Sequence, residues 1–593
     1  MVGGAIREWT SDLRVVCFSP NDAVWRWTLP QAQFLEALQQ RGDEIIYVYC
    51  DREYSSFCMS MASSGIRFTS DPSAKQAVCN TCVRQSEMVR SRVGFAGRTL
   101  RSFLRPEDID VADRLSREAS IDDLYDYVEH GLTVGRLALY ETMIQTKSIS
   151  KDLSPEAQGF YRSNFRNTLI SVRASKAMLN ELKPDIGVSY HTAYAYNRAF
   201  QRVFEEGNVP VWFLNASFNV AELDTHLIAA RSDPEILFRK MLEDWPRFEG
   251  IACAERDVAS VADHLLALMG GGGFGYSNAM HRGTIAVMQK LGCPPGKKIV
   301  AALLSSYDEL LAAELAGFGW TTHNDVFSSQ VEWVRWLFEF ARARPDMHIV
   351  VRAHPREFAV NGVGNRSEHS YLLESAFEEK PANVSINLPS DGIALYDLLM
   401  EVDAALIAWS SAGMDAGMLG VPVVTYAGDA LLFPRQLTYD ANSREEYAEF
   451  VDQAIGAGWS LERSRAYFRW AVLMMARTRI DVTNGASTPT RQSRLGRLAR
   501  RASRRLALAA TSLSREELGL RFLRPRRLCD AYRIFTLLDQ NLSAFYDADA
   551  APTGPDLRTE TEALRRQLRR ISEFVEKRRG NSPTKLNSAI CRS

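Results

Sequence analysis

Cysteine is scarce in this chain of 593 residues, where it occurs only nine times. So low a content excludes a small scaffold held together by disulfides. Long apolar runs are also missing: no stretch reaches about 18 consecutive apolar residues, so we expect no membrane-spanning helix. Residues 1–9 contain Arg7 and Glu8 but no apolar core, which is not typical of a secretory signal. These absences predict a cytoplasmic protein.

An overall excess of one charge is absent too, because the net charge is only −1. With 46% hydrophobic and 24% charged residues the composition is that of a globular protein, and the length favours two or more domains. The charges are nevertheless unevenly placed. Residues 491–593 carry 23 lysines and arginines against 11 acidic residues, which leaves about −13 on the remainder. A basic tail on an acidic body predicts an anionic partner for the tail.

The first half of the chain alternates between strand and helix patterns. Short apolar segments at 13–18 and 44–50 flank a helical pattern over 29–41 that stops at Gly42. Strand, helix and strand in this order indicate a parallel sheet. Residues from about 85 to 180 are expected to be mostly helical. The alternation returns in strand 183–190, helix 193–206 and strand 209–214.

A run of glycines at 270–273 predicts a flexible joint, and a second unit of the same kind follows it. Its expected elements are strands 297–304, 347–352, 404–409 and 420–426 and a helix over 330–344. We therefore predict an α/β protein with two doubly wound Rossmann-like domains and a basic helical C-terminal extension. The expected boundaries are 1–275, 290–480 and 490–580, with a disordered tail over 581–593.

Ligands of open α/β sheets bind beyond the carboxyl ends of the strands. The clearest motif at such a place is Arg352-Ala-His-Pro-Arg-Glu357, directly after a strand. Pro355 disfavours a helical conformation at His354, which holds the imidazole at the strand tip between two guanidinium groups. This cluster suits a phosphate or a carboxylate. The alternative is a surface loop whose charges pair among themselves.

A second motif, Ser410-Ser-Ala-Gly-Met-Asp415, opens a helix after an apolar strand. A helix start offers free N–H groups and a partial positive charge to a phosphate. The carboxylate of Asp415, one turn onward, has the lone pairs to accept hydrogen bonds from ribose hydroxyls. The alternative is an ordinary helix cap with an acidic first turn.

The two motifs together, followed by Gly420-Val-Pro-Val, resemble those of bacterial capsule and surface-polysaccharide glycosyltransferases of the GT-B fold. The likeness is greatest to the group that includes Kdo- and sialyltransferases using CMP-sugars, and CDP-glycerol glycerophosphotransferases look similar. It covers residues 297–430 well and the N-terminal half only in outline. In that family the His-Pro histidine and the Ser-Ser pair contact the nucleotide phosphate, which implies these roles for His354, Ser410 and Ser411.

Two positions depart from the family pattern. The acidic residue after Ser-Ser is usually Glu, but here it is Asp415, and relatives often carry Trp-Asp where this chain has Tyr307-Asp308. The donor-binding residues that we expect are Tyr307, Asp308, Arg352, His354, Arg356, Glu357, Ser410, Ser411 and Asp415.

The resemblance implies a glycosyltransferase that moves a sugar from a nucleotide donor, CMP-linked, to a surface polysaccharide or lipid-linked glycan. No metal is expected for catalysis. The alternatives are a CDP-glycerol-type glycerophosphotransferase, a nucleotide-sugar epimerase and a degenerate transferase that serves as an assembly scaffold. Residues 1–275 would form the acceptor side and 290–480 the donor side.

Transfer to an acceptor hydroxyl needs a base. Asp22 and His191 each follow a strand of the N-terminal domain and are candidates. Their ordinary alternatives are a turn or cap residue and a hydrogen-bonded core histidine. Tyr194, Asn197 and Arg198 lie one turn beyond His191 and are expected to line the acceptor site.

Four cysteines fall within 33 residues, and Cys79 and Cys82 have the spacing of a zinc knuckle. The separation of Cys50 from Cys58 is loose for the other half of such a site. A structural zinc ion on these four residues, buried thiols and a redox pair stay open as interpretations.

The C-terminal extension begins with a run of arginines. Residues 491–515 hold eight arginines and no acidic residue, with leucines at helical spacing, which predicts a basic amphipathic helix on an anionic membrane surface. A second helix over 561–580 has one apolar face and could pair with a partner helix. The alternative for both is an ordinary helical appendage. Nucleic-acid binding is not expected, because the tail lacks interleaved aromatic residues. The protein is thus expected at the inner face of the cytoplasmic membrane.

Overall fold

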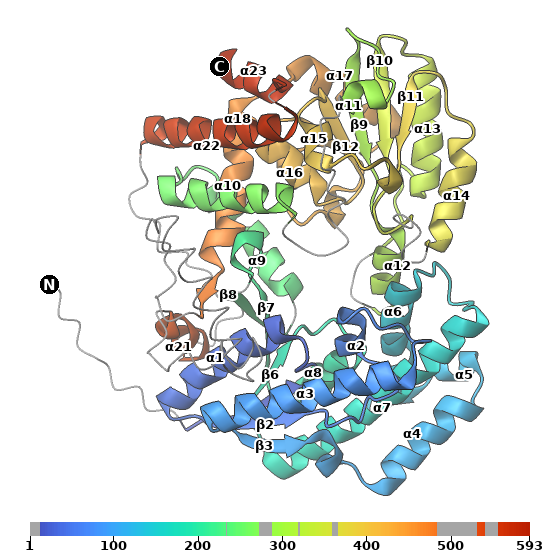
Figure 1. Ribbon diagram of the computed structural model, residues 1–593, viewed down its shortest axis with the longest axis vertical. Helices are drawn as coiled ribbons and strands as arrows, with labels where there is room; N and C mark the ends of the chain where they lie inside the picture. The colour runs from blue at the N-terminus through green and yellow to red at the C-terminus, as the bar shows by residue number, and fades with distance from the viewer. Residues whose placement is uncertain are drawn as a thin grey trace, which may run out of the picture.

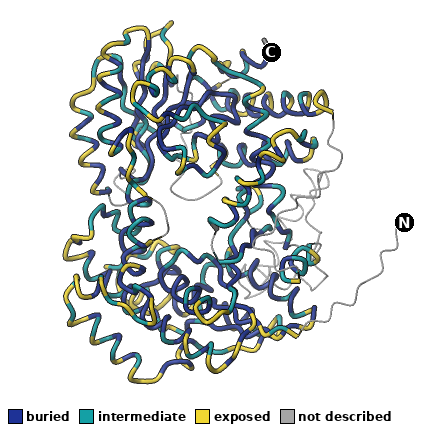
Figure 2. Tube along the Cα trace, turned by 180° about the vertical axis from the view of Figure 1, so that it is seen from behind, coloured by how far each residue is buried: buried dark blue, intermediate teal, exposed yellow. Residues whose placement is uncertain are grey.

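Two β-sheets, one mostly and one wholly parallel and each covered by helices, form the lower and upper halves of the molecule in Figure 1. The computed structural model describes residues 12–223, 225–232, 234–271, 287–317, 321–358, 366–482, 530–539, 556–580 and 582–592. In both halves the central strands are buried on both faces (Figure 2). This explains why they read as continuous apolar runs rather than as alternating ones.

The first sheet has seven strands in the order β15-β8-β7-β6-β1-β2-β3. The five parallel strands are β1 (Arg14–Ser19), β2 (Glu44–Tyr49), β3 (Ala96–Thr99), β6 (Ile186–Tyr190) and β7 (Val211–Ala216). Two antiparallel strands complete the sheet, β8 (His226–Arg231) and β15 (Ile480–Asp481). Strands β1, β2, β6 and β7 confirm the strands predicted in this half.

Helices of the first domain follow the predicted alternation. Helix α1 (Trp25–Arg41) ends at Gly42, whose φ of 113° is left-handed, so the predicted glycine stop is confirmed. The predicted helical region contains α3 (Pro72–Val93), α4 (Pro106–Glu118), α5 (Ile121–Tyr125), α6 (Val134–Thr146) and α7 (Pro155–Leu182). A short hairpin, β4 (Val128–Glu129) and β5 (Leu132–Thr133), interrupts it. The remaining helices are α2 (Met59–Ser63), α8 (Ala195–Glu206), α9 (Pro234–Phe248) and α10 (Glu255–Met269).

The second sheet is parallel throughout, in the order β11-β10-β9-β12-β13-β14. Its strands are β9 (Lys298–Leu303), β10 (Met347–Arg352), β11 (Val384–Asn387), β12 (Ala404–Ile407), β13 (Val423–Thr425) and β14 (Tyr439–Asp440). The surrounding helices are α11 (Val287–Lys290), α12 (Tyr307–Leu315), α13 (Gln330–Arg342), α14 (Glu368–Phe377), α15 (Leu395–Leu399), α16 (Ala412–Met418), α17 (Arg444–Ala457) and α18 (Leu461–Val472). Two Rossmann-like domains are therefore present, as the sequence predicts.

The two domains touch on opposite sides of the molecule. On one side α12 packs against α6, and Ala312 of α12 is buried among the apolar residues of the first domain (Figure 1). Arg356 donates a hydrogen bond to the Ile144 carbonyl at 2.8 Å, and the N–H of Ile149 donates to Glu368 at 2.9 Å. On the other side the chain leaves α18 and returns to the first sheet as β15. The loop after β10 is thus tied directly to the first domain.

The C-terminal helices belong to the folded body. Helix α21 (Ala531–Asp539) packs on α1, and α22 (Leu557–Arg578) packs along α10. The predicted apolar face of α22 is buried in this contact, through Leu564, Leu568, Ile571 and Val575. The face that could have paired with a partner helix is therefore covered by the chain itself.

Disorder was predicted for residues 581–593, and this prediction is wrong for 585–592, which form α23 (Lys585–Arg592). Leu586 and Ile590 bury their side chains against the second domain, which provides the apolar contact that orders the segment. The predicted basic helix over 491–515 lies outside the described residues. No described helix is long and apolar enough to cross a membrane.

Candidate functional site

A cavity of about 670 Å³ opens at the carboxyl edge of the second sheet. Its wall combines Tyr307 after β9, Trp409 after β12 and the segment 426–432 after β13 with the loop that precedes α13. Helix α9 closes it from the side of the first domain, through Glu235, Phe238, Arg239 and Leu242. Pockets for small molecules and cofactors span about 300–1,000 Å³, so a nucleotide sugar fits. The cavity occupies the place where open α/β sheets bind ligands.

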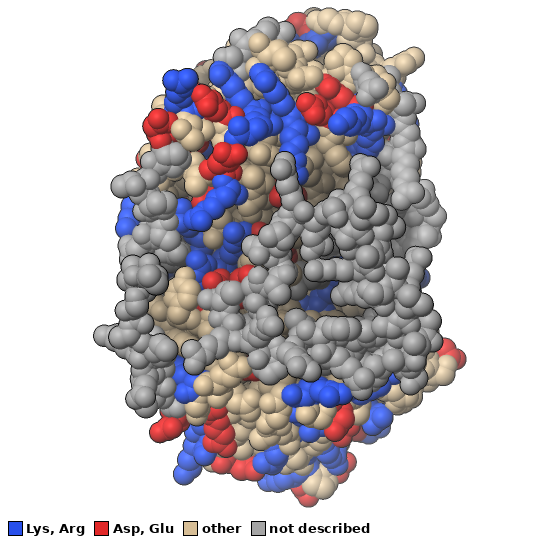
Figure 3. Space-filling model, turned by 60° about the vertical axis from the view of Figure 1, so that its left-hand side comes forward, with Lys and Arg blue, Asp and Glu red and all other residues tan. Residues whose placement is uncertain are grey.

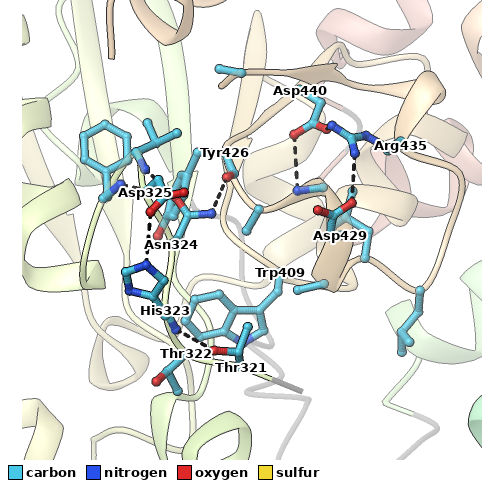
Figure 4. A pocket seen from close by; sticks show the side chains of 18 of the residues that line it. Thr321, Thr322, His323, Asn324, Asp325, Trp409, Tyr426, Asp429, Arg435 and Asp440 are labelled. Carbon is cyan, nitrogen blue, oxygen red and sulfur yellow. Dashed lines mark hydrogen bonds and ion pairs between the residues drawn. The ribbon is translucent and has the colours of Figure 1, made fainter. Parts of the chain in front are cut away.

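Trp409 presents the largest flat surface in the cavity wall. It directly follows β12, and its indole ring lies half-buried beside Thr321 and Thr322 (Figure 4). An indole placed against a cavity offers a π-face for stacking a nucleobase or a sugar ring. In the sequence Trp409 ends the predicted strand 404–409 and directly precedes the Ser-Ser motif, a pattern that predicts no stacking role for it.

The loop from Thr321 to Phe327 forms one rigid edge of the cavity. The Asn324 amide donates to the Tyr426 carbonyl at 2.7 Å, and its oxygen accepts from the N–H groups of Val326 and Phe327. Asn324 is therefore committed to holding the loop (Figure 4). His323 and Asp325 are exposed and pair with each other at 3.0 Å.

Charges in the cavity wall are mostly neutralised. Arg435 binds Asp429 at 2.8 Å and Asp440 at 2.5 Å, so its guanidinium is already engaged (Figure 4). Arg239 of α9 is exposed and lines the cavity without an ion pair among the described residues. It is therefore the cavity-lining arginine best placed to meet an anionic ligand group.

His354 lies half-buried at the tip of β10, one strand away from β9. Burial lowers its pKa to about 4, so the imidazole is neutral at pH 7. Its Nδ1 accepts the N–H of Arg356 at 3.3 Å, which leaves the proton on Nε2. A neutral His354 can thus donate one hydrogen bond to a phosphate oxygen, but it does not contribute a positive charge.

Ser410 and Ser411 stand where β12 passes into α16. The Ser410 hydroxyl accepts the N–H of Ala412 at 3.3 Å, and Ser411 is exposed at the cap position. Tyr307, at the neighbouring strand tip, lines the cavity and stacks on His369 with ring centroids 4.8 Å apart. Tyr307 lines the cavity, whereas Ser410, Ser411 and His354 are not among its lining residues, so their contact with a donor stays a prediction.

The expected phosphate contacts from Arg352, Arg356, Asp308 and Glu357 need correction. Arg352 donates to Asn387 and to the Ile393 carbonyl, away from the cavity wall. Burial lowers its pKa to about 10, which marks it as a structural cation.

Arg356 is equally occupied, because it forms an ion pair with the buried Asp308 and donates to Ser306. Glu357 is fully buried and accepts the N–H of Tyr307 at 3.0 Å. Arg356 and Glu357 are therefore each bound by residues from other elements, and not by each other as the alternative interpretation supposed. They stiffen the loop that carries His354.

Asp415 does not face the cavity. Its carboxyl group is buried and accepts a hydrogen bond from Tyr396 at 2.9 Å. Burial raises its pKa to about 7. The side chain is one methylene shorter than the Glu of the family pattern and is held by a core tyrosine, so a contact to ribose is not supported in this conformation.

Asp22 is likewise buried rather than presented to an acceptor. It is 0% exposed and accepts hydrogen bonds from Ser19 and Tyr47 at 2.5 and 2.6 Å. Burial raises its pKa to about 6. A carboxylate enclosed in this way cannot reach an acceptor hydroxyl, so the prediction of Asp22 as catalytic base is wrong for this conformation.

His191 keeps a position at the sheet edge. It follows β6 with a φ of 64°, a left-handed conformation that is strained for a residue with a side chain. Burial lowers its pKa to about 4, so it is neutral and weakly basic. Its ring stacks on Tyr194 at 4.4 Å. Both residues are half-buried and remain candidates for the acceptor side.

Asn197 and Arg198 were predicted to line the acceptor site, but both are buried. The Asn197 amide donates to the carbonyls of Tyr190 and His191 at 2.8 and 3.0 Å, and Arg198 donates to Gln201. They support the turn that carries His191 instead of presenting their charged or amide groups to solvent.

Sequence reasoning missed the carboxyl group of Glu141 on α6. It is 1% exposed, and neither oxygen has a hydrogen-bond partner of normal geometry among the described residues. Burial raises its pKa to about 8, with the N–H of Ala195 offsetting part of the effect. A single Glu in a mostly apolar helix gave no periodic signal for this role.

Glu141→Gln is expected to stabilise the protein at alkaline pH. The folded state keeps the proton up to about pH 8, whereas an unfolded Glu loses it near its ordinary value of 4.5. Stability therefore falls as pH rises between these two values and levels off above the higher one. The variant should gain about 2–4 kcal/mol over the parent at pH 8.5 and less at pH 5. Denaturant unfolding at both pH values measures this, and an equal difference at both would contradict it.

The four clustered cysteines do meet in space. Cys50, Cys58, Cys79 and Cys82 line one small cavity of the first domain. Burial raises the pKa of all four thiols, that of Cys58 to about 12. Among the described residues, however, no group of three or more His, Cys, Asp or Glu side chains is arranged to hold a metal ion. The zinc ion, the buried thiols and the redox pair stay open as interpretations of this cluster.

No family model matches the sequence, and no curated protein is found to be similar to it. The similar solved structures include KpsC, a β-Kdo 2,4-transferase from Thermosulfurimonas dismutans, with 15% identity over 51% of this chain and 83% of that one and a TM-score of 0.30. A UDP-GlcNAc 2-epimerase from Neisseria meningitidis bound to UDP-GlcNAc shares 11% identity over 78% of this chain and 94% of that one, with a TM-score of 0.26. The calicheamicin glycosyltransferase CalG4 shares 15% identity over 78% of this chain and 94% of that one, with a TM-score of 0.24.

The strand order defines the fold. One mostly parallel and one wholly parallel sheet are each covered by helices, the chain crosses back to the first sheet as β15, and a cavity opens at the carboxyl edge of the second sheet, which is the GT-B arrangement.

Proposed function

We propose that the protein is a glycosyltransferase that takes its sugar from a nucleotide-activated donor. One observation carries this proposal: the cavity of about 670 Å³ at the carboxyl edge of the second sheet, closed by a helix from the first domain. The strand tips supply an aromatic face, and α9 supplies Arg239, which has no ion pair within the described part of the chain. A nucleotide has a flat base, which an aromatic side chain can stack on, and an anionic phosphate, which an arginine can bind.

In the proposed complex the nucleobase or sugar stacks on Trp409. The phosphate lies toward Ser410 and Ser411 after β12 and toward the Nε2–H of His354 after β10, two strand tips separated by that of β9. Because His354 is neutral, it donates a hydrogen bond to the phosphate but adds no positive charge that would slow release of the nucleotide. Arg239 adds the positive charge from the opposite wall.

The finer identity of the reaction follows from the resemblance of the His-Pro and Ser-Ser motifs. On that basis we propose a CMP-linked donor and an acceptor that is a surface polysaccharide or a lipid-linked glycan. The acceptor would approach from the first domain, where His191 and Tyr194 stand at the facing sheet edge.

Product analysis distinguishes this reaction from its alternatives. The protein is incubated in separate tubes with a CMP-sugar, CDP-glycerol and UDP-GlcNAc, each with and without oligosaccharide acceptors, and the products are followed by NMR. Transfer of the sugar from the CMP donor, with release of CMP, is the expected result. An inverted sugar still attached to UDP would identify an epimerase. Transfer of glycerol phosphate would identify the glycerophosphotransferase. Either result would overturn the proposal.

A membrane-facing role for the tail is a separate proposal. Residues 491–515 are outside the described part, but their eight arginines would each contribute about 1 kcal/mol at an anionic surface. On the side where α22 lies, lysine and arginine side chains gather on the upper part of the molecule (Figure 3). Four of them belong to α22, although Arg566 and Arg570 pair with acidic residues of α10.

Truncation is a poor test of this proposal, because removing the tail would also remove α21 and α22 from the folded body. Changing the eight arginines of 491–515 to glutamine is expected to abolish binding to anionic liposomes and to leave the melting temperature unchanged. Binding of the parent should fall as salt rises. Equal binding of the parent to neutral and anionic vesicles would reject the electrostatic mechanism.

A further inference from the structure

A buried polar network lies at the carboxyl ends of β1 and β6, on the edge of the first sheet. Ser19 donates to Asp22 and accepts from the Gln31 amide at 2.8 Å. The amide of Asn197 donates to two backbone carbonyls at 2.8 and 3.0 Å. These contacts fix which end of each amide is the NH₂ group, and therefore where each amide oxygen points.

Both amide oxygens are left without a partner. Gln31 and Asn197 are each 1% exposed, and Gln31 Oε1 and Asn197 Oδ1 have no hydrogen bond in the described part of the chain. A buried acceptor without a donor costs about 1–3 kcal/mol. Two such atoms close to one sheet edge indicate a place where a donor from outside the chain is expected.

A small cavity lies between these two residues. Gln31 and Asn197 both line it, together with Ser19, Asn21, Trp27 and Tyr190, and it has room for about one water-sized group. The two amide oxygens accept hydrogen bonds, so the matching group is a donor and not a carboxylate or phosphate. A hydroxyl group has the right size and polarity.

Aromatic rings form the rim of the cavity. The ring of Trp27 lies nearly parallel to those of Tyr190 and Tyr194, with centroids 5.5 and 5.7 Å away, and His191 stacks on Tyr194 at 4.4 Å. Trp27, His191 and Tyr194 are half-buried, so part of each ring reaches the surface. Parallel rings beside a polar cavity suit a ligand with both an apolar C–H face and hydroxyl groups.

The backbone is shaped to hold this arrangement. His191 adopts a φ of 64°, which places its ring against Tyr194, and Asn197 secures the strained turn through the carbonyls on either side of the Tyr190–His191 peptide. Strain kept in place by dedicated hydrogen bonds is typical of binding sites. Asn197 thus both holds the turn and turns its free oxygen to the interior.

We propose that this surface binds the acceptor and that the acceptor is a carbohydrate. Its ring packs against the parts of the Trp27 and Tyr194 rings that reach the surface, and one hydroxyl enters the small cavity toward Gln31 and Asn197. Only the role of this carbohydrate as the acceptor rests on the proposed glycosyl transfer. Carbohydrate binding at this surface does not depend on that function.

Binding to an array of immobilised bacterial-type oligosaccharides tests the inference. The parent protein should be retained by a subset of neutral or acidic glycans. Trp27→Ala and Gln31→Met should each lower the apparent affinity at least tenfold, the first by removing the stacking face and the second by removing the acceptor atom. Tyr371→Ala, which removes an exposed aromatic ring of α14, is the matched control and should bind like the parent.

Circular dichroism and CMP binding check each variant. A variant that keeps its fold and its CMP affinity but loses glycans supports the site. If Trp27→Ala fails to fold, Tyr194→Ala at the rim decides instead. Retention of no glycan by the parent, or equal retention by folded Trp27→Ala or Tyr194→Ala, would overturn the inference. Glycan binding by a parent that binds no nucleotide would overturn the proposed function and leave this site standing.

Discussion

Replacing Trp409 with alanine is expected to weaken nucleotide binding by about 10- to 100-fold. The indole is the broadest flat surface in the wall of the cavity, where it lies beside Thr321 and Thr322 (Figure 4). Stacking of a base on an aromatic side chain contributes about 1–3 kcal/mol, which corresponds to this range of affinities. Isothermal titration with CMP measures the loss.

Trp409→Phe is the matched control. A phenyl ring keeps a π-face at the same position, so its affinity should stay within about threefold of the parent. Arg239→Gln on the opposite wall should weaken CMP binding as well, because it removes a cation that has no ion pair among the described residues. An unchanged affinity in Trp409→Ala would place the nucleotide elsewhere.

Replacing Glu560 with alanine is expected to have the largest effect on stability. Glu560 is 2% exposed, binds Arg469 through both carboxylate oxygens at 2.6 and 2.9 Å, and accepts the N–H of Cys253 at 2.8 Å. Arg465 lies 3.5 Å away. Removing the carboxylate leaves buried cations uncompensated, which costs about 3–5 kcal/mol.

Thermal and denaturant unfolding measure this effect. Glu562→Ala on the same helix is the control, since its ion pair with Arg558 is exposed on both sides and should contribute less than about 1 kcal/mol. The comparison tests whether α22 is part of the folded body. Equal, small effects of the two substitutions would mean that α22 is an independent appendage.

The central strands were predictable because a strand that is buried on both faces has a continuous run of apolar residues in the sequence. Strands β1, β2, β6, β9, β10 and β12 follow this rule. The short edge strands β14 and β15 have only two residues each, too few for any periodic signal. The return of β15 to the first sheet is a long-range pairing, which no local pattern encodes.

The strand-tip positions of the site were predictable, but the direction of each side chain was not. His354, Ser410 and Tyr307 stand at adjacent strand tips, as the motifs indicated. Asp22 and Asp415 also sit at predicted positions, yet both turn inward because a tyrosine hydroxyl is present to bind each carboxyl group. Such a partner is distant in sequence.

The position of Arg239 in the cavity wall was not predictable from the sequence. It lies in an ordinary amphipathic helix of the first half, and only the tertiary fold brings that helix to the cavity of the second domain. Trp27 and Gln31 are similar: Gln31 lies in the predicted helix 29–41 and Trp27 just before it, and no motif marks either residue. Their roles depend on contacts with β6, which begins far along the chain.

The crystal structure of the protein grown with CMP tests the central claim most directly. CMP is expected in the cavity at the carboxyl edge of the second sheet, with its base or ribose against Trp409 and its phosphate within hydrogen-bond distance of His354 Nε2 or the Ser410–Ser411 turn. A CMP molecule bound at another place, or an empty cavity at CMP concentrations that saturate the protein in solution, would contradict the account.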